Sequence, residues 1–181
     1  MRPPMAERRA RRIWGFRAIY LLFGLAVILY RILPLQTGIP ALPGPDFILA
    51  VTLAWVLRQP ATVPLAAVLF LFLIGDVLLQ RPPGLWTALA VLVMEFLRNR
   101  RAGIAEAPFL FEWGLVAGAI LAMVLGQRVI LWILVTDQPS LGLALMEGLA
   151  TIVLYPFVVL VSKYLLGLDR LPVMEREPGK S

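Results

Sequence analysis

Long apolar segments constrain the fold of this chain more than any other feature of its sequence. The chain has six such segments, at about 13–33, 46–57, 61–80, 85–97, 109–135 and 140–166. Short connectors rich in Pro, Gly and Arg separate them. A helix that crosses a bilayer needs about 20 apolar residues, so six crossings use roughly 120 residues and leave no room for a soluble domain. The sequence therefore predicts an all-α integral membrane protein with six transmembrane helices in one compact bundle.

Composition supports this class and removes several kinds of chemistry. Hydrophobic residues make up 60% of the chain and charged residues 15%, against about 45–50% and about 25% in soluble domains. The chain contains no Cys and no His, which excludes disulfides, thiol nucleophiles and imidazole acid–base chemistry. Nucleotide-binding loops and the nucleophile elbow of hydrolases are also missing. We expect neither an enzyme nor a metal or other cofactor.

The distribution of positive charge predicts the topology. Arg31, Arg81 and Arg128 fall toward one side of a six-crossing arrangement, and the other fourteen of the 17 Lys and Arg residues fall toward the opposite side. Positive residues concentrate on the cytoplasmic side of a membrane, so both termini are expected in the cytoplasm. We attribute the net charge of +6 to this orientation and to anionic lipid, and expect no nucleic-acid partner.

Three regions follow from these boundaries. Residues 1–12 form a basic cytoplasmic N-terminal tail, residues 13–166 the six-helix membrane domain, and residues 167–181 a flexible cytoplasmic tail. The second and fourth segments are short for a crossing. The charge distribution nevertheless requires both of them to cross, because otherwise the cluster at 98–101 would lie on the wrong side.

Charged residues inside apolar segments are the first candidates for function, because burying a charge in a membrane is costly. Arg128 and Glu147 lie nine residues before and ten residues after Asp137 in a predicted hairpin, so we expect them at similar depth and paired. An ion or proton path is one interpretation, and a structural ion pair is the favoured one.

Two more candidates lie near a predicted turn. Asp76 comes six residues before Pro82, and Arg81 lies at the same interface. A substrate or proton site is one interpretation, and a locally paired carboxylate is the favoured one. Glu95 and Arg98 are expected to pair across one helical turn, and Glu112 is expected to interact with the dipole of its helix.

A stripe of small residues follows the fifth segment. At 100° per residue, four positions spaced by four fall on one narrow face: Gly114, Gly118, Ala122 and Gly126. Small residues allow close approach of another helix in lipid. Packing within the chain is the favoured interpretation, and docking of another protein's helix is the alternative.

Several local motifs occur in an order that resembles the rod shape-determining protein MreD family, in its alphaproteobacterial form. The resemblance covers about residues 18–168, and its most specific piece is Pro82-Pro83-Gly84-Leu85-Trp86. The other pieces are Pro45-Asp46, Ala54-Trp55-Val56-Leu57-Arg58-Gln59-Pro60, Asp76, Gln80-Arg81, Glu112-Trp113 and Leu154-Tyr155-Pro156.

The resemblance implies a non-catalytic scaffold in the bacterial inner membrane that belongs to the elongation complex. Its partners would be MreC foremost, then the transpeptidase and glycosyltransferase of peptidoglycan synthesis, and the cytoskeletal MreB. The family is also similar in fold to the six-helix substrate-binding subunits of energy-coupling-factor transporters. The alternative function is therefore a small-molecule-binding subunit of a vitamin-type transporter, with Asp76, Arg81, Trp86 and Glu147 near its pocket.

Overall fold

The computed structural model describes residues 5–33, 43–135 and 140–166, and the described residues are helical apart from short turns. Six α-helices follow in chain order, with a single 3₁₀ turn, η1, between the second and the third. They are α1 (Met5–Ile32), α2 (Phe47–Arg58), η1 (Pro60–Thr62), α3 (Leu65–Leu78), α4 (Leu85–Ala105), α5 (Phe109–Ile133) and α6 (Leu141–Leu166). The predicted all-helical fold is confirmed.

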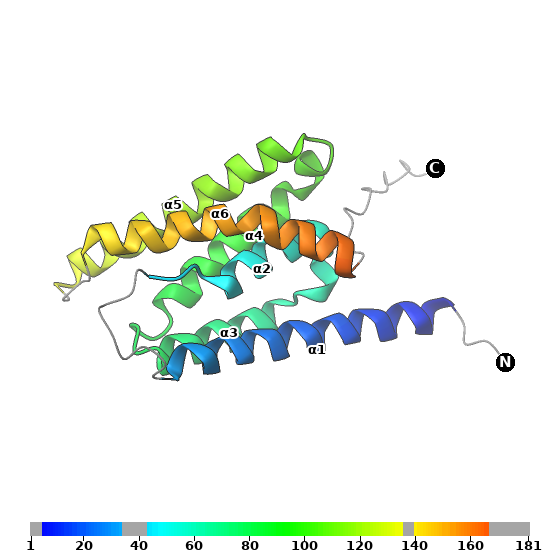
Figure 1. Ribbon diagram of the computed structural model, residues 1–181, viewed down its shortest axis with the longest axis horizontal. Helices are drawn as coiled ribbons and strands as arrows, with labels where there is room; N and C mark the ends of the chain where they lie inside the picture. Colours follow the sequence, from blue (N-terminus) through cyan, green and yellow to red (C-terminus); the bar gives the residue numbers. More distant parts are fainter. Residues whose placement is uncertain (1–4, 34–42, 136–139, 167–181) are drawn as a thin grey trace, which may run out of the picture.

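The helices form three layers of two. The middle layer is α2 and α4, which pack on each other. One outer layer consists of α5 and α6, in which α5 packs on α4 and α6 packs on α2. The other outer layer consists of α1 and α3, in which α3 packs on α4 (Figure 1). Most of α2 is buried as a result, and so are its N-cap residue, Asp46, and its last residue, Arg58.

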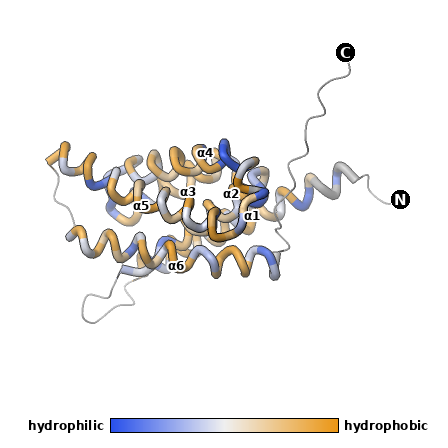
Figure 2. The backbone as a smooth tube through the Cα atoms, turned by 90° about the horizontal axis from the view of Figure 1, so that it is seen from above, coloured by the Kyte–Doolittle hydropathy of each residue, from blue (hydrophilic) through white to orange (hydrophobic). Residues whose placement is uncertain are grey.

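Among the residues that the structure describes, three helices are long and apolar enough to cross a membrane. They lie within α1, α5 and α6, at Ala10–Ile32, Phe109–Ile133 and Leu141–Tyr164. Figure 2 shows hydrophobic residues along most of the helical length, and many large apolar side chains face outward, as on Leu110, Trp132 and Val153. Outward apolar side chains on long helices are typical of a membrane protein.

Helix boundaries differ from the predicted segments at three places. Helix α1 begins at Met5, so residues 5–12, expected as a tail, continue the helix; Arg, Ala and Glu there are strong helix formers. Helix α4 continues eight residues past the predicted end at residue 97. The third segment is divided because Pro64, which lacks a backbone N–H, precedes the first residue of α3. The predicted C-terminal tail, 167–181, lies outside the described residues.

Arginines explain the extension of α4. Arg98 donates to the carbonyl of Val63, and Arg101 donates to the carbonyls of Leu57 and Arg58. The last carbonyls of α2 have no partner within their own helix, so these donors satisfy them. The predicted pair between Glu95 and Arg98 is confirmed, with 3.2 Å between the charged atoms.

Candidate functional site

Asp46 organises the start of α2. One carboxylate oxygen, Oδ1, accepts a hydrogen bond from the backbone N–H of Leu49 at 3.0 Å, which is an N-cap. The other, Oδ2, accepts from the indole of Trp86 at 3.1 Å. The backbone N–H of Asp46 donates to Thr151 Oγ1 at 2.9 Å. One residue thus connects α2 to α4 and to α6.

Asp76 performs a similar role for α4. Its Oδ2 accepts from the backbone N–H groups of Gly84 and Thr87, at 3.0 and 3.1 Å, and from the Thr87 hydroxyl at 2.8 Å. These donors lie at the first turn of α4, where a carboxylate is favourable. Gly84 has φ +84°, which a glycine adopts without strain. The favoured interpretation of Asp76 as a locally held carboxylate agrees with this geometry.

Arg81 and Arg31 meet on Glu147. The carboxylate Oε1 of Glu147 lies 3.1 Å from Arg81 Nη2 and 3.4 Å from Arg31 Nη1. Arg81 also lies 3.9 Å from Asp46 Oδ2 and over the ring of Trp86, 5.2 Å from its centroid. We call Arg31, Asp46, Asp76, Arg81 and Glu147 the Glu147 cluster. It joins α1, α2, α3, α6 and the turn before α4.

The predicted ion pair between Arg128 and Glu147 is wrong. Among the described residues, the cations that pair with Glu147 are Arg31 and Arg81, and Arg128 has other interactions. Equal depth along a hairpin does not fix the rotation of each helix about its own axis. The partners of Glu147 instead lie 116 and 66 residues away in the sequence, outside the hairpin that α5 and α6 form.

A second polar network lies at the opposite end of α2. Arg58 Nη1 lies 2.8 Å from Glu112 Oε1, and the Tyr155 hydroxyl donates to the same oxygen at 2.6 Å. All three residues are at most 4% exposed. We call Arg58, Glu112 and Tyr155 the Glu112 triad, and it joins α2, α5 and α6.

Sequence reasoning missed this triad. The sequence predicted only that Glu112 interacts with the dipole of its own helix, although a carboxylate within an apolar helix requires a partner. The signal that could have identified the partner was Arg58, the sole positive charge between the second and third apolar segments.

The small-residue stripe of α5 faces out of the bundle over most of its length. Gly114, Gly118 and Ala122 are exposed, and a Cβ added at either glycine would have no neighbour within 4 Å. Only Gly126 is close to another helix, since its Cβ position lies 3.7 Å from Leu89. The favoured interpretation, packing within the chain, is therefore wrong for the first three positions.

Other glycines provide the close helix contacts. A Cβ added to Gly24 of α1 would lie 2.5 Å from Leu71 of α3, and one added to Gly148 of α6 would lie 3.2 Å from Val124 of α5. Gly24 belongs to no regular spacing of small residues, so no sequence pattern singled it out.

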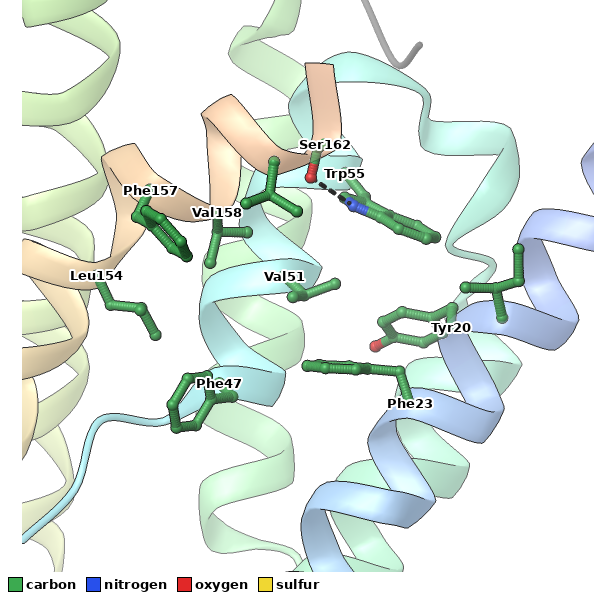
Figure 3. Close-up of a pocket in the computed structure, with 11 residues that line it drawn as sticks. Tyr20, Phe23, Phe47, Val51, Trp55, Leu154, Phe157, Val158 and Ser162 are labelled. Atoms are coloured by element: carbon green, nitrogen blue, oxygen red, sulfur yellow. Dashed lines mark hydrogen bonds between the residues drawn. The ribbon is translucent and has the colours of Figure 1, made fainter. Parts of the chain in front are cut away.

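A groove runs between α1 and α6, with α2 as its floor (Figure 3). Its apolar part has a volume of about 280 Å³. Phe23 from α1, Phe47 and Val51 from α2, and Leu154 and Phe157 from α6 line it. The hydrogen bond from Trp55 to Ser162, 3.0 Å long, closes the end of the groove near the Glu112 triad.

The groove widens at its other end into an open region of about 930 Å³. Phe23 and Phe47 line both parts, so the two are continuous. The charged side chains lining the open part are Arg31, Arg81 and Glu147. We call the two parts together the α1–α6 groove.

Two further observations concern the chemistry of the site. Within the described ranges, no three Asp or Glu side chains gather in a way that could hold a metal ion. Comparison with protein-family profiles, curated proteins and solved structures finds no match.

Proposed function

We propose that this protein is a non-catalytic scaffold of the MreD type, a six-crossing protein of the bacterial inner membrane. Its task would be to hold components of the elongation complex together and to couple peptidoglycan synthesis to the cytoskeleton, and so to control cell shape. The resemblance in sequence motifs supplies this identity, and the arrangement of those motifs in the fold supports it.

The observation that carries the proposal is the convergence of the motifs on two internal networks. Pro45-Asp46, Asp76 and the segment from Arg81 to Trp86 contribute to the Glu147 cluster or bond directly to it. Arg58, Glu112 and Tyr155 form the Glu112 triad. Pieces of sequence up to about 100 residues apart thus meet in polar contacts that fix helix positions, which is an architectural role.

The geometry of the ends supports the proposed topology. The start of α1 and the end of α6 lie toward the same end of the bundle (Figure 1), as an even number of crossings requires. Arg98, Arg100 and Arg101 near the end of α4 belong to the positively charged side of the six-crossing arrangement.

The exposed face of α5 is the proposed contact for a partner helix. Gly114, Gly118 and Ala122 present no bulky side chain, so another backbone can approach closely, which is a main source of helix association in lipid. The single spanning helix of MreC is the partner that the family resemblance names.

The test compares two glycine variants in rod-shaped cells that depend on this protein. Gly118→Leu places a large side chain on the proposed contact, and Gly103→Leu places the same side chain on α4, where an added Cβ also meets nothing. We expect Gly118→Leu to fold with an unchanged melting temperature, to lose MreC on copurification and to produce round cells. Gly103→Leu should behave like the unmodified protein. Unchanged cell width after depletion of the protein would contradict the assignment to cell shape.

The alternative is a small-molecule-binding subunit of a vitamin-type transporter. The convergence of Arg81, Trp86 and Glu147 favours it. However, the two cavities that border Trp86 hold only about 20 Å³ each, against about 300–1,000 Å³ for small-molecule sites. The open region of about 930 Å³ beside Arg31, Arg81 and Glu147 is large enough, but neither Asp76 nor Trp86 lines it. Saturable vitamin binding by the purified protein would move this alternative to first place.

A further inference from the structure

We propose that the α1–α6 groove is a binding site for one phospholipid. Its phosphate would lie against Arg31 and Arg81, and one acyl chain would follow the apolar part of the groove. This inference is independent of the proposed scaffold function, because it concerns α1, α2 and α6, whereas the proposed partner contact lies on α5.

The apolar part has the lining that an acyl chain requires. Its surface comes almost wholly from Phe, Leu, Val and Ile side chains, and the hydroxyl of Ser162 is occupied by Trp55. The Tyr20 hydroxyl is likewise bonded to Thr52, at 2.8 Å. Both hydroxyl groups at this part of the groove are therefore already hydrogen-bonded within the protein, which leaves an apolar channel.

The length of the groove corresponds to one leaflet. Its residues on α1 run from Ile19 to Arg31, and twelve residues of α-helix rise about 18 Å. Half of the hydrocarbon core of a bilayer is about 15 Å. An acyl chain that follows the groove thus places its headgroup at the level of Arg31 and Arg81.

The charges of the open part match a phosphodiester. Two arginines and one glutamate line it, whereas the carboxylates of Asp46 and Asp76 are buried behind them and already accept hydrogen bonds from α2 and α4. The side chains that a headgroup would meet therefore carry one net positive charge. Arg31, Arg81 and Glu147 have side chains 21–27% exposed, so a headgroup can reach them. The guanidinium of Arg81 donates from Nη2 to Glu147, and its Nη1 lies 3.9 Å from Asp46 Oδ2; a guanidinium has five N–H donors. It can bind phosphate and Glu147 together.

The walls of the groove favour a lipid over a partner helix. Helices approach each other closely where the contact residues are small, but Phe23, Phe47 and Phe157 project from the three sides of this groove (Figure 3). A helix with its side chains is about 10–12 Å across and rises 5.4 Å per turn, so one turn occupies roughly 400–600 Å³, more than the volume of about 280 Å³ of the apolar part. A flexible acyl chain, which is one methylene group wide, fits this space.

The experiment is native mass spectrometry on the full chain, stripped of lipid in detergent. The probes are phosphatidylglycerol, phosphatidylethanolamine and diacylglycerol with identical acyl chains. We expect one molecule of either phospholipid to bind at least about tenfold more tightly than diacylglycerol, the factor that one charge-assisted hydrogen bond of about 1.4 kcal/mol provides. Equal binding of diacylglycerol would overturn the proposal.

Charge variants separate recognition from loss of fold. Arg31→Gln should weaken phosphatidylglycerol binding about tenfold, whereas Glu147→Gln should strengthen it, because it removes the competing anion. A general loss of structure would weaken both. Arg17→Gln, which removes an arginine from the other end of α1, is the matched control and should change nothing. Weaker binding by Glu147→Gln with an unchanged melting temperature would contradict the phosphate assignment.

A third arm identifies the occupant in native membranes. A photoreactive side chain at position 157, on the wall of the groove, should crosslink to lipid. Crosslinks to another protein at this position would show that a partner occupies the groove and would overturn the proposal.

Discussion

Arg58 and Glu112 are joined by an ion pair of 2.8 Å between α2 and α5 whose side chains are 5% and 0% exposed. Burying two opposite charges is not a strong source of stability in itself, because desolvation offsets most of their attraction. The pair instead disfavours alternative packings of α5 against α2. Any shift of α5 along α2 would strand one or both charges in an apolar interior.

The first prediction concerns this pair. Arg58→Met or Glu112→Gln alone should lower the free energy of unfolding by about 3–5 kcal/mol, because the remaining partner stays buried. The double variant should lose clearly less than the sum of the two. Denaturant titration in detergent measures all three, and Glu95→Gln, from a half-exposed surface pair, is the control at about 0–1 kcal/mol. Additive losses would show that the two residues are not coupled.

The second prediction concerns Glu147. A double-mutant cycle between Arg81 and Glu147 should give a coupling free energy above about 0.5 kcal/mol, since their charged atoms lie 3.1 Å apart. The same cycle between Arg128 and Glu147 should be additive within about 0.5 kcal/mol. Thermal unfolding in detergent gives both values. A larger coupling for Arg128 would contradict the ion pairs described above.

The third prediction distinguishes glycines by the side of the helix they occupy. Gly24→Ala should destabilise the protein by about 1–3 kcal/mol, because the added methyl overlaps the fully buried Leu71. Gly118→Ala should leave stability unchanged to within about 1 kcal/mol. Leu71→Ala has a cost of its own, about 2–5 kcal/mol, so the test is a double-mutant cycle: Gly24→Ala should destabilise the Leu71→Ala variant less than it destabilises the unmodified protein. An equal cost in both backgrounds would place the cause of the loss elsewhere.

The fourth prediction concerns topology. The chain contains no Cys, so single cysteines can be introduced without background labelling. Pro83 and Arg100 are both exposed and lie near opposite ends of α4. In intact cells, an impermeant thiol reagent should label a cysteine at 83 and should label one at 100 only after the membrane is opened. Labelling at 100 from outside would contradict six crossings with cytoplasmic termini.

The sequence predicted the parts of this fold that depend on one segment at a time. Apolar runs and prolines placed α2, α5 and α6 to within about two residues. The pair between Glu95 and Arg98 was also predictable, because three residues of helix fix the distance between them.

Contacts between distant segments were not predictable in the same way. Glu147 had several arginines at a suitable depth, and the choice of Arg31 and Arg81 depends on how six helices are arranged and rotated. The stripe on α5 illustrates the same limit. Its spacing showed that the four residues share a face, but only the packed bundle shows that Gly114 and Gly118 point away from the rest of the chain.

The central position of α2 has a consequence for how the protein is made. Its Asp46 bonds to Trp86 and Thr151, and its Trp55 bonds to Ser162. These partners are synthesised up to 107 residues after α2 itself. Until α6 has been synthesised, this short helix of twelve residues lacks two of these three partners, Thr151 and Ser162. The middle layer is therefore completed only when α6 packs on α2, and a chain that stops before α6 leaves the Asp46 backbone N–H and the Trp55 indole without these acceptors.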